Sequence, residues 1–220
     1  MMTAMNIALI DYGAGNLHSC SKALMRALDM AGIAGEVIIG ADPDVIASAD
    51  RIVLPGDGAF KDCRDELAAV DGLEAALHDA IRVKKRPFLG ICVGMQLLAD
   101  LGEENGETAG LGWIPGRVVA LDPEERHLKV PHMGWNTLEA RSSHPILDGI
   151  EMGENGLHAY FLHSYHVLPK HAEDLIAIAN YGGPVSAIVG RGNIVGTQFH
   201  PEKSQTLGLK LLSNFLRWTP

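Results

Sequence analysis

The sequence predicts an α/β protein whose open, mixed and mostly parallel sheet is covered by helices on both faces. Short apolar segments alternate with segments of helical periodicity through the first half of the chain, a pattern typical of parallel strands joined by helices. In the second half the apolar segments follow one another closely, which indicates further strands of a mixed sheet. No linker or internal repeat divides the 220 residues, so we expect a single domain over residues 1–220.

The individual elements follow from these two periodicities. Buried strands of the first half are expected at residues 7–10, 37–39, 51–54 and 88–91. Helices are expected at residues 17–30, 43–49, 67–83 and 93–101. Later strands are expected at residues 116–121, 159–167, 175–180, 186–189 and 194–198, followed by a closing helix at residues 206–218. Residues 102–110 are polar and rich in glycine, so we expect a surface loop there.

The composition argues against several classes of function. A formal net charge of −9 disfavours nucleic acid or an anionic membrane as the main partner, because both would repel the chain. No apolar stretch approaches the roughly 20 residues of a membrane span, and the first residues lack the basic region of an export signal. Three cysteines without a CxxC motif or a His-rich ligand pair predict neither a disulfide framework nor a structural zinc site, and they fit a reducing, cytoplasmic compartment.

Cys92 lies at the centre of a Gly-Ile-Cys-Val-Gly motif, between a predicted strand and a predicted helix. A nucleophile at such a turn has a strained backbone, and the flanking glycines leave room for the crowded main chain. The thiol would project from the carboxyl end of its strand, where ligands bind in open α/β sheets. The backbone N–H of Val93 and the start of the helix would stabilise an oxyanion and favour the thiolate.

The late segment His200-Pro-Glu202 supplies the two groups that a thiol nucleophile needs. His200 can accept the thiol proton, and Glu202 can hold the imidazole in one tautomer and stabilise the imidazolium. Pro201 favours an extended or turn geometry in which both side chains project to the same side. A lone cysteine is more often a small buried hydrophobe, but the combination predicts a Cys-His-Glu triad.

A second glycine-rich turn, Leu54-Pro-Gly-Asp-Gly58, leaves a predicted strand at the same edge of the sheet. Its glycines would allow the N–H of Gly58 to approach a reacting carbonyl as the second oxyanion donor. An ordinary tight turn is the alternative interpretation of this segment.

Together these motifs resemble the class I (triad) glutamine amidotransferases over essentially the whole chain. The resemblance depends on Gly90-x-Cys92-x-Gly94-x-Gln96 and on the late His-Pro-Glu segment. Residues 11–17 (DYGAGNL), 130–136 (VPHMGWN) and 160–165 (YFLHSY) are further similar to the glutaminase subunits of imidazole glycerol phosphate synthases, in histidine biosynthesis. The resemblance implies the flavodoxin-like fold of the class and no cofactor.

The resemblance also implies roles for individual residues. Cys92 would attack the side-chain amide of L-glutamine, His200 would transfer the proton, and Glu202 would orient His200. The oxyanion would be bound by Val93 and Gly58. Glutamine contacts are implied for Gly56, Gln96, Glu104, Ser164 and Tyr165. Contacts with a partner are implied for Tyr12, Asn16, Pro131, His132, Trp135, Asn136 and Tyr160.

The implied partner is a separate, barrel-shaped cyclase subunit that forms a heterodimer with this chain and receives ammonia through a channel. A channel is needed because free ammonia is mostly protonated at neutral pH and then cannot act as a nucleophile. The family implies that the isolated chain is a poor glutaminase. Asp57 departs from the pattern, because the family more often has an apolar residue there. The resemblance therefore does not fix the backbone conformation of Gly56-Asp57-Gly58.

Other interpretations remain open from the residues alone. Gln96 could be satisfied within its helix, Glu104 could be a solvated loop charge, and Trp135 could be a core residue. The chain could instead supply ammonia to another synthase, such as pyridoxal phosphate synthase, or be a free-standing cysteine hydrolase. A scaffold with a vestigial thiol is the non-enzymatic alternative.

Overall fold

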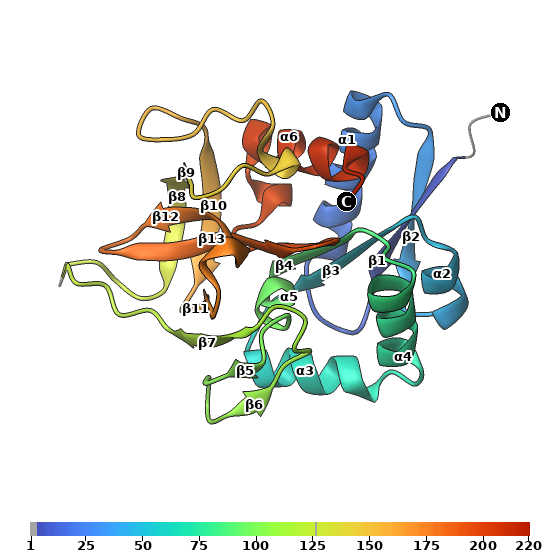
Figure 1. The fold of residues 1–220 in the computed structure, drawn as a ribbon, viewed down its shortest axis with the longest axis horizontal. Coiled ribbons are helices and arrows are strands. Elements are labelled where there is room, and N and C mark those ends of the chain that lie inside the picture. Colours follow the sequence, from blue (N-terminus) through green and yellow to red (C-terminus); the bar gives the residue numbers. More distant parts are fainter. Residues whose placement is uncertain (1–3, 126) are drawn as a thin grey trace.

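The main sheet of the protein has eight strands, in the order β2-β1-β3-β4-β14-β13-β12-β9. We describe it from a computed structural model that covers residues 4–125 and 127–220 (Figure 1). The first five strands in this order run parallel to one another. Each of the last three is antiparallel to the strand before it in the order. The parallel part therefore has the 2-1-3-4-5 order of flavodoxin-like folds.

The parallel strands coincide with the buried strands that the sequence predicts. They are β1 (Met5–Ile10), β2 (Gly35–Gly40), β3 (Arg51–Gly56), β4 (Phe88–Cys92) and β14 (Ile194–Thr197). The antiparallel strands are β13 (Pro184–Arg191), β12 (Leu175–Asn180) and β9 (Glu139–Ala140). Strands β3, β4 and β14 are almost wholly buried, as expected of parallel strands with both faces covered.

Helices cover both faces of the parallel strands (Figure 1). One face carries α1 (Leu17–Ala31) and α6 (Gln205–Arg217), which pack against each other. The other face carries α2 (Pro43–Ser48), α3 (Phe60–Ala69) and α4 (Leu73–His78), followed by a π turn, η1 (Asp79–Val83). The start of α1 is fixed locally, because the Asn16 side chain accepts a hydrogen bond from the Ser19 N–H at 3.2 Å.

Two smaller sheets adjoin the antiparallel strands. One contains β11 (Tyr165–Pro169), β7 (Gly116–Ala120), β5 (Leu101–Gly102) and β6 (Thr108–Ala109), in that order. The other pairs β10 (His158–His163) with β8 (His132–Thr137). Short 3₁₀ turns complete the fold: η2 (Pro145–Leu147), η3 (Ala172–Asp174) and η4 (Pro201–Lys203). β11 contacts β13 and β8 contacts β12, so both small sheets are held by the main one.

Two of the predicted helices are shorter in the structure. The helix expected at residues 67–83 is divided into α3, α4 and η1, because Gly72 has a φ of 73° and interrupts it. The helix expected at residues 93–101 is only α5 (Val93–Gln96). Beyond it, the carbonyls of residues 97–99 accept hydrogen bonds from the N–H groups of residues 111–114, and these bonds replace the continuation of the helix.

Differences in the second half of the chain concern strands. The strand expected at residues 159–167 is two strands, β10 and β11, which separate at Ser164 and join different sheets. The loop expected at residues 102–110 contains the short β5–β6 hairpin. The sequence prediction did not include β8. Its six residues alternate only weakly between apolar and polar types, so their pairing with β10 depends on tertiary contacts.

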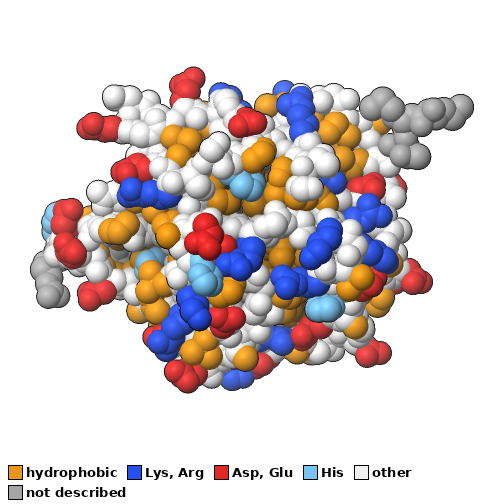
Figure 2. Space-filling view, in the orientation of Figure 1, with side chains coloured by type: hydrophobic (Ala, Val, Ile, Leu, Met, Phe, Trp, Pro, Cys, Tyr) orange, Lys and Arg blue, Asp and Glu red, His pale blue; other side chains and the backbone are white. Residues whose placement is uncertain are grey.

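The surface mixes both signs of charge. Acidic and basic side chains are interspersed over the face seen in Figure 2, with hydrophobic side chains between them. No helix within residues 4–125 and 127–220 is both long and apolar enough to cross a membrane.

The closing helix packs very closely against the turn that contains His200-Pro-Glu202. A Cβ atom at Gly208 of α6 would lie 1.8 Å from the carbonyl oxygen of Pro201. Only glycine therefore allows η4 to rest on the helix in this position.

We predict that Gly208→Ala lowers the free energy of unfolding by up to about 2 kcal/mol, because overpacking against Pro201, which costs up to about 3 kcal/mol, outweighs the roughly 1 kcal/mol that alanine gains in a helix. The measurement is urea unfolding followed by circular dichroism. Gly40→Ala is the matched control, because nothing lies within 4 Å of a Cβ at that position. Equal stability of the two variants would contradict this account of α6.

Candidate active site

Two neighbouring parallel strands bring the predicted nucleophile and base together. β4 ends at Cys92, and β14 pairs with it through Gly196–Gly90 and Thr197–Ile91, so that His200 follows at the same end of the sheet. In open α/β sheets this carboxyl end is where ligands bind. Residues more than a hundred positions apart in the sequence therefore meet at one site.

Cys92 occupies a strained turn between β4 and α5. Its φ is 56° and its ψ is −113°, a combination that side chains rarely adopt and that costs on the order of 1–3 kcal/mol. Its thiol is 3.9 Å from the carbonyl oxygen of Leu162 and 3.8 Å from Nε2 of Gln198. The turn thus has the backbone conformation expected of a nucleophile elbow.

The flanking glycines are required by the close packing of backbone around the turn. A Cβ at Gly94 would lie 2.0 Å from the carbonyl oxygen of Leu54, and one at Gly90 would lie 2.5 Å from the carbonyl oxygen of Gly94. Gly56 is equally confined, because a Cβ there would lie 2.6 Å from the N atom of Gly94. Gly94 and Gly56 let the turn approach the backbone of β3 without a steric clash, and Gly90 lets α5 fold back onto β4.

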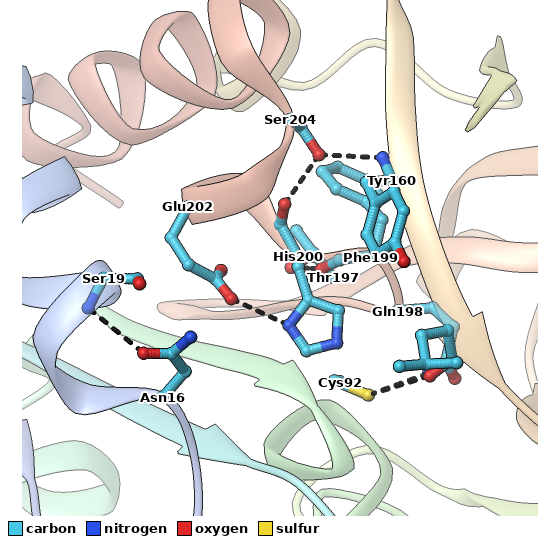
Figure 3. Close-up of polar contacts among 11 residues, drawn as sticks. Asn16, Ser19, Cys92, Tyr160, Thr197, Gln198, Phe199, His200, Glu202 and Ser204 are labelled. Atoms are coloured by element: carbon cyan, nitrogen blue, oxygen red, sulfur yellow. Dashed lines mark hydrogen bonds and ion pairs between the residues drawn. The ribbon is translucent and has the colours of Figure 1, made fainter. Parts of the chain in front are cut away.

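His200 and Glu202 form a buried pair. Nδ1 of His200 is 2.8 Å from Oε1 of Glu202, and the two side chains are only 4% and 3% exposed. Nε2 of His200 makes no hydrogen bond within the described part of the chain, and Figure 3 shows the ring between Glu202 and Cys92. The free nitrogen is therefore available to accept a proton from the thiol.

The charge state of His200 depends on its two neighbours. Burial alone lowers the pKa of the imidazole, but its interactions with Cys92 and Glu202 outweigh burial and raise that pKa above its usual value. A raised pKa favours the imidazolium, and a thiolate beside an imidazolium is the reactive form of a cysteine nucleophile.

Strand β10 holds the His200 backbone in place. The N–H of His200 donates to the carbonyl oxygen of Tyr160 at 2.9 Å. The hydroxyl of Ser204 donates to the His200 carbonyl at 2.6 Å and accepts from the Tyr160 N–H at 2.9 Å (Figure 3). These bonds tie the position of the His200 backbone to that of β10.

A cavity of about 230 Å³ opens beside the thiol. Most of the predicted oxyanion and substrate residues line it together with Cys92: Gly58, Val93, Gln96, Glu104, Ser164 and Tyr165. Gly56 does not line this cavity and lies beneath the elbow, at the end of β3. Asp57, Pro131, Leu162 and His163 complete the wall. The cavity is thus a place where a small polar molecule can meet the thiol.

Gln96 and Glu104 both have partners far along the chain. Nε2 of Gln96 donates to the carbonyl oxygen of Tyr165 at 3.0 Å and to Oε1 of Gln198 at 3.1 Å. Oε2 of Glu104 accepts a hydrogen bond from the N–H of Phe60 at 2.7 Å. Gln96 is therefore not satisfied within its own helix, and Glu104 is not a merely solvated loop charge.

Some of the residues expected at a partner interface are exposed, and others are buried. Trp135 is 48% exposed and packs edge-on against the ring of Tyr160, at 5.5 Å between centroids. Asn16 and Pro131 are exposed, and Asn136 is half-buried. Tyr12 and His132 do not fit this expectation, because their side chains are only 4% and 2% exposed.

Tyr12 instead supports the site from beneath. Its hydroxyl donates to the carbonyl oxygen of Pro55 at 2.9 Å, at the end of β3. The His132 ring is stacked on the ring of Tyr181. Its Nδ1 lies 3.1 Å from Nε2 of His163. Both side chains therefore act inside the protein.

Sequence reasoning missed several residues of the site. Gln198 contacts the Cys92 thiol and supports Gln96, and its position two residues before His200 was an available signal because strand side chains alternate. Ser204 gave no local signal, because its role depends on β10, whereas His163 lies in the 160–165 segment but was given no role. No group of three or more His, Cys, Asp or Glu side chains in residues 4–125 and 127–220 is arranged to hold a metal ion.

Comparisons with known proteins agree on a family. The model of the family "Glutamine amidotransferase class-I" matches residues 8–218. The imidazole glycerol phosphate synthase subunit HisH of Rhizobium meliloti is 58% identical, covering 98% of this chain and 100% of that protein. The HisH subunits of Agrobacterium fabrum and Rhodopseudomonas palustris are 57% and 53% identical, with the same coverage.

Solved structures show the same fold at low identity. A putative GMP synthase protein from Thermoplasma acidophilum has a TM-score of 0.68 at 21% identity, covering 99% of this chain and 94% of its own. A glutamine amidotransferase structure has a TM-score of 0.68 at 17% identity, with 96% and 97% covered.

The buried histidines near the site predict an acid-sensitive stability. Burial lowers the pKa of His132 and His166 to about 4 and that of His163 to about 3. At pH 5–6 these side chains are neutral when folded, whereas an unfolded histidine gains a proton below about pH 6.5. Since the unfolded state then binds more protons, the free energy of unfolding falls as the pH falls, by up to about 1.4 kcal/mol per pH unit for each group.

His166→Gln should make that slope shallower by about 1 kcal/mol per pH unit between pH 5 and 6, because an unfolded histidine is only partly protonated so close to its ordinary pKa of about 6.5. Urea unfolding at several pH values measures the slope, and comparison with the unsubstituted protein cancels the groups common to both. Parallel stability curves for the two proteins would contradict a neutral, buried His166.

Proposed function

The chain belongs to the class I glutamine amidotransferases, and we propose that it hydrolyses L-glutamine as the glutaminase subunit of an imidazole glycerol phosphate synthase, in histidine biosynthesis. Full-length relatives that carry the name of that subunit support the proposal. The observation that carries the chemistry is the pairing of β4 with β14, with a strained Cys92 and a hydrogen-bonded His200–Glu202 pair beside one cavity.

The first half of the reaction forms a thioester. Sγ of Cys92 attacks the side-chain amide carbon of glutamine while His200 holds the proton. The oxyanion of the tetrahedral intermediate would accept hydrogen bonds from the N–H groups of Val93 and Gly58, each of which contributes roughly 3–4 kcal/mol. His200 then donates its proton to the departing nitrogen, the C–N bond breaks, and ammonia leaves.

The second half restores the enzyme. A water molecule gives a proton to His200 and attacks the glutamyl thioester, and the C–S bond breaks to release glutamate. Glu202 stays hydrogen-bonded to Nδ1 throughout and stabilises the imidazolium when it forms. The thiol must remain reduced for this cycle, so we place the reaction in the cytoplasm.

The cavity suits the polar ends of glutamine. Ser164 and Tyr165 line it between β10 and β11, and Gln96 fixes the Tyr165 carbonyl from behind. Glu104 offers a carboxylate to the ammonium group of the substrate. Gly56 contributes through its close packing beneath the elbow rather than through a position on the wall.

The partner would be a cyclase subunit that consumes the ammonia. An apolar surface on and beside β8 supports this part of the proposal, because Val130, Met133 and Trp135 are 46%, 66% and 48% exposed. The paired strand β10 binds the His200 backbone through Tyr160. A cyclase docked on β8 and β10 would therefore contact the strand that holds the catalytic base and receive ammonia without release to water.

Cys92→Ala is expected to lower glutamine hydrolysis by at least about 10³-fold, because the covalent intermediate cannot form. Product formation by the heterodimer from ammonium salts should be retained. Ammonia release and cyclase product are measured side by side. Cys20→Ala is the control, since Cys20 is also a free, buried thiol but lies on α1. Persistent glutamine-dependent activity in Cys92→Ala would refute the assignment.

The isolated chain is expected to hydrolyse glutamine slowly and to accelerate by about tenfold or more when the cyclase and its nucleotide ligand are added. Met133→Glu should weaken this activation, because it places a charge on the proposed docking surface. Met25→Glu is the matched control, since Met25 is also exposed, at 56%, but lies on α1. A fully active isolated chain, or equal effects of both substitutions, would contradict the proposed docking surface.

A further inference from the structure

Helix α3 begins directly after the Asp57-Gly58 turn and lacks a cap from its own sequence. The residue before it, Ala59, has no side chain that can accept a hydrogen bond from the first N–H groups. Instead, Oε2 of Glu104 accepts the N–H of Phe60 at 2.7 Å, from 44 residues away. A carboxylate at this end of a helix is favourable in charge as well as in hydrogen bonding.

The position of Glu104 beside α3 is set by how the preceding strand, β5, packs and pairs. Gly102 of β5 lies so close to the buried Phe60 ring that a Cβ there would be 2.5 Å from Cδ1. β5 is itself fixed by pairing with β7, at Gly102–Val118. The loop that carries Glu104 is therefore held against the start of α3.

The segment Gly56-Asp57-Gly58, which we call the oxyanion segment, depends on the first turn of α3. The thiol of Cys63, on the first turn of α3, donates to the carbonyl oxygen of Asp57 at 3.5 Å, and the N–H of Cys63 donates to the Ala59 carbonyl at 3.1 Å. Gly58 between them has a φ of 114°, and nothing lies within 4 Å of a Cβ there. Gly58 therefore lies between two residues, Asp57 and Ala59, whose carbonyls are both hydrogen-bonded to the first turn of α3.

We infer that Glu104 is a positioning residue for the oxyanion segment, in addition to facing the substrate. Its Oε2 fixes the start of α3 and with it Gly58, while Glu104 also lines the cavity beside Cys92. One side chain thereby links occupation of the cavity to the geometry of the segment that would stabilise the oxyanion. This inference rests on the proposed glutaminase function.

The two roles of Glu104 can be separated with glutaramate, which is glutamine without its α-amino group. Glutaramate offers no ammonium for Glu104 to bind, so a loss of kcat/KM in Glu104→Ala, at an unchanged rate of Cys92 alkylation, reports the displaced segment. We expect that loss to be about tenfold. Glu104→Gln keeps an oxygen for the Phe60 N–H and should hydrolyse glutaramate like the unsubstituted chain, while its KM for glutamine rises.

The assay uses the heterodimer with the nucleotide ligand bound, and alkylation of Cys92 by iodoacetamide provides a second readout. Alkylation needs no oxyanion donor, so its rate should be unchanged in both variants. Glu103→Ala is the control for the loop, because Glu103 pairs with Arg117 rather than with α3. If Glu104→Ala does not fold, Glu104→Asp tests the same point, since its shorter side chain keeps the charge but loses the reach to Phe60.

Two results would overturn the inference. Unchanged glutaramate hydrolysis in Glu104→Ala or Glu104→Asp would show that Glu104 only contacts the substrate. Slower alkylation of Cys92 in step with slower hydrolysis would show general damage to the site. Failure of the unsubstituted heterodimer to release ammonia from glutamine would instead refute the proposed function, and the two failures are therefore distinguishable.

Discussion

The parallel pairing of β4 with β14 is the interaction on which the rest of the site depends. It sets Cys92 and His200 at the same end of the sheet, although 107 residues separate them in the chain. The pairing would be useless without the strained turn at Cys92, which costs on the order of 1–3 kcal/mol. Tight packing of Gly94 against the buried strand β3 holds that turn in place.

Around this pair the fold supplies support from three directions. Glu202 orients His200 from η4, β10 holds the His200 backbone through Tyr160 and Ser204, and Gln198 contacts the thiol from the residue after β14. Each support is a hydrogen bond to a buried group, and such bonds are costly to break because the freed atom cannot reach water. Breaking any one of these bonds should therefore disturb the position of His200 or of the thiol.

The parts of the fold and site that could be predicted from sequence are those with a local cause. The parallel strands and the ends of α1 follow from periodicity and capping, and the elbow at Cys92 follows from its glycines. The prediction of helices failed where N–H groups from a distant segment bond to the carbonyls that would continue the helix, as they do beyond Gln96. The weakly alternating strand β8 was missed because only its partner β10 makes it a strand.

The sequence by itself determined which chemistry this protein carries, because a nucleophile turn and a His-Pro-Glu segment are written in contiguous residues whose backbone needs are local. Only the tertiary structure decided how those groups are supported and which side chains reach the surface. Gln96 meets Tyr165, Glu104 meets Phe60, and Tyr12 is buried against Pro55, all through contacts between distant segments. Such contacts are set by how the strands and loops pack, which no short stretch of sequence encodes.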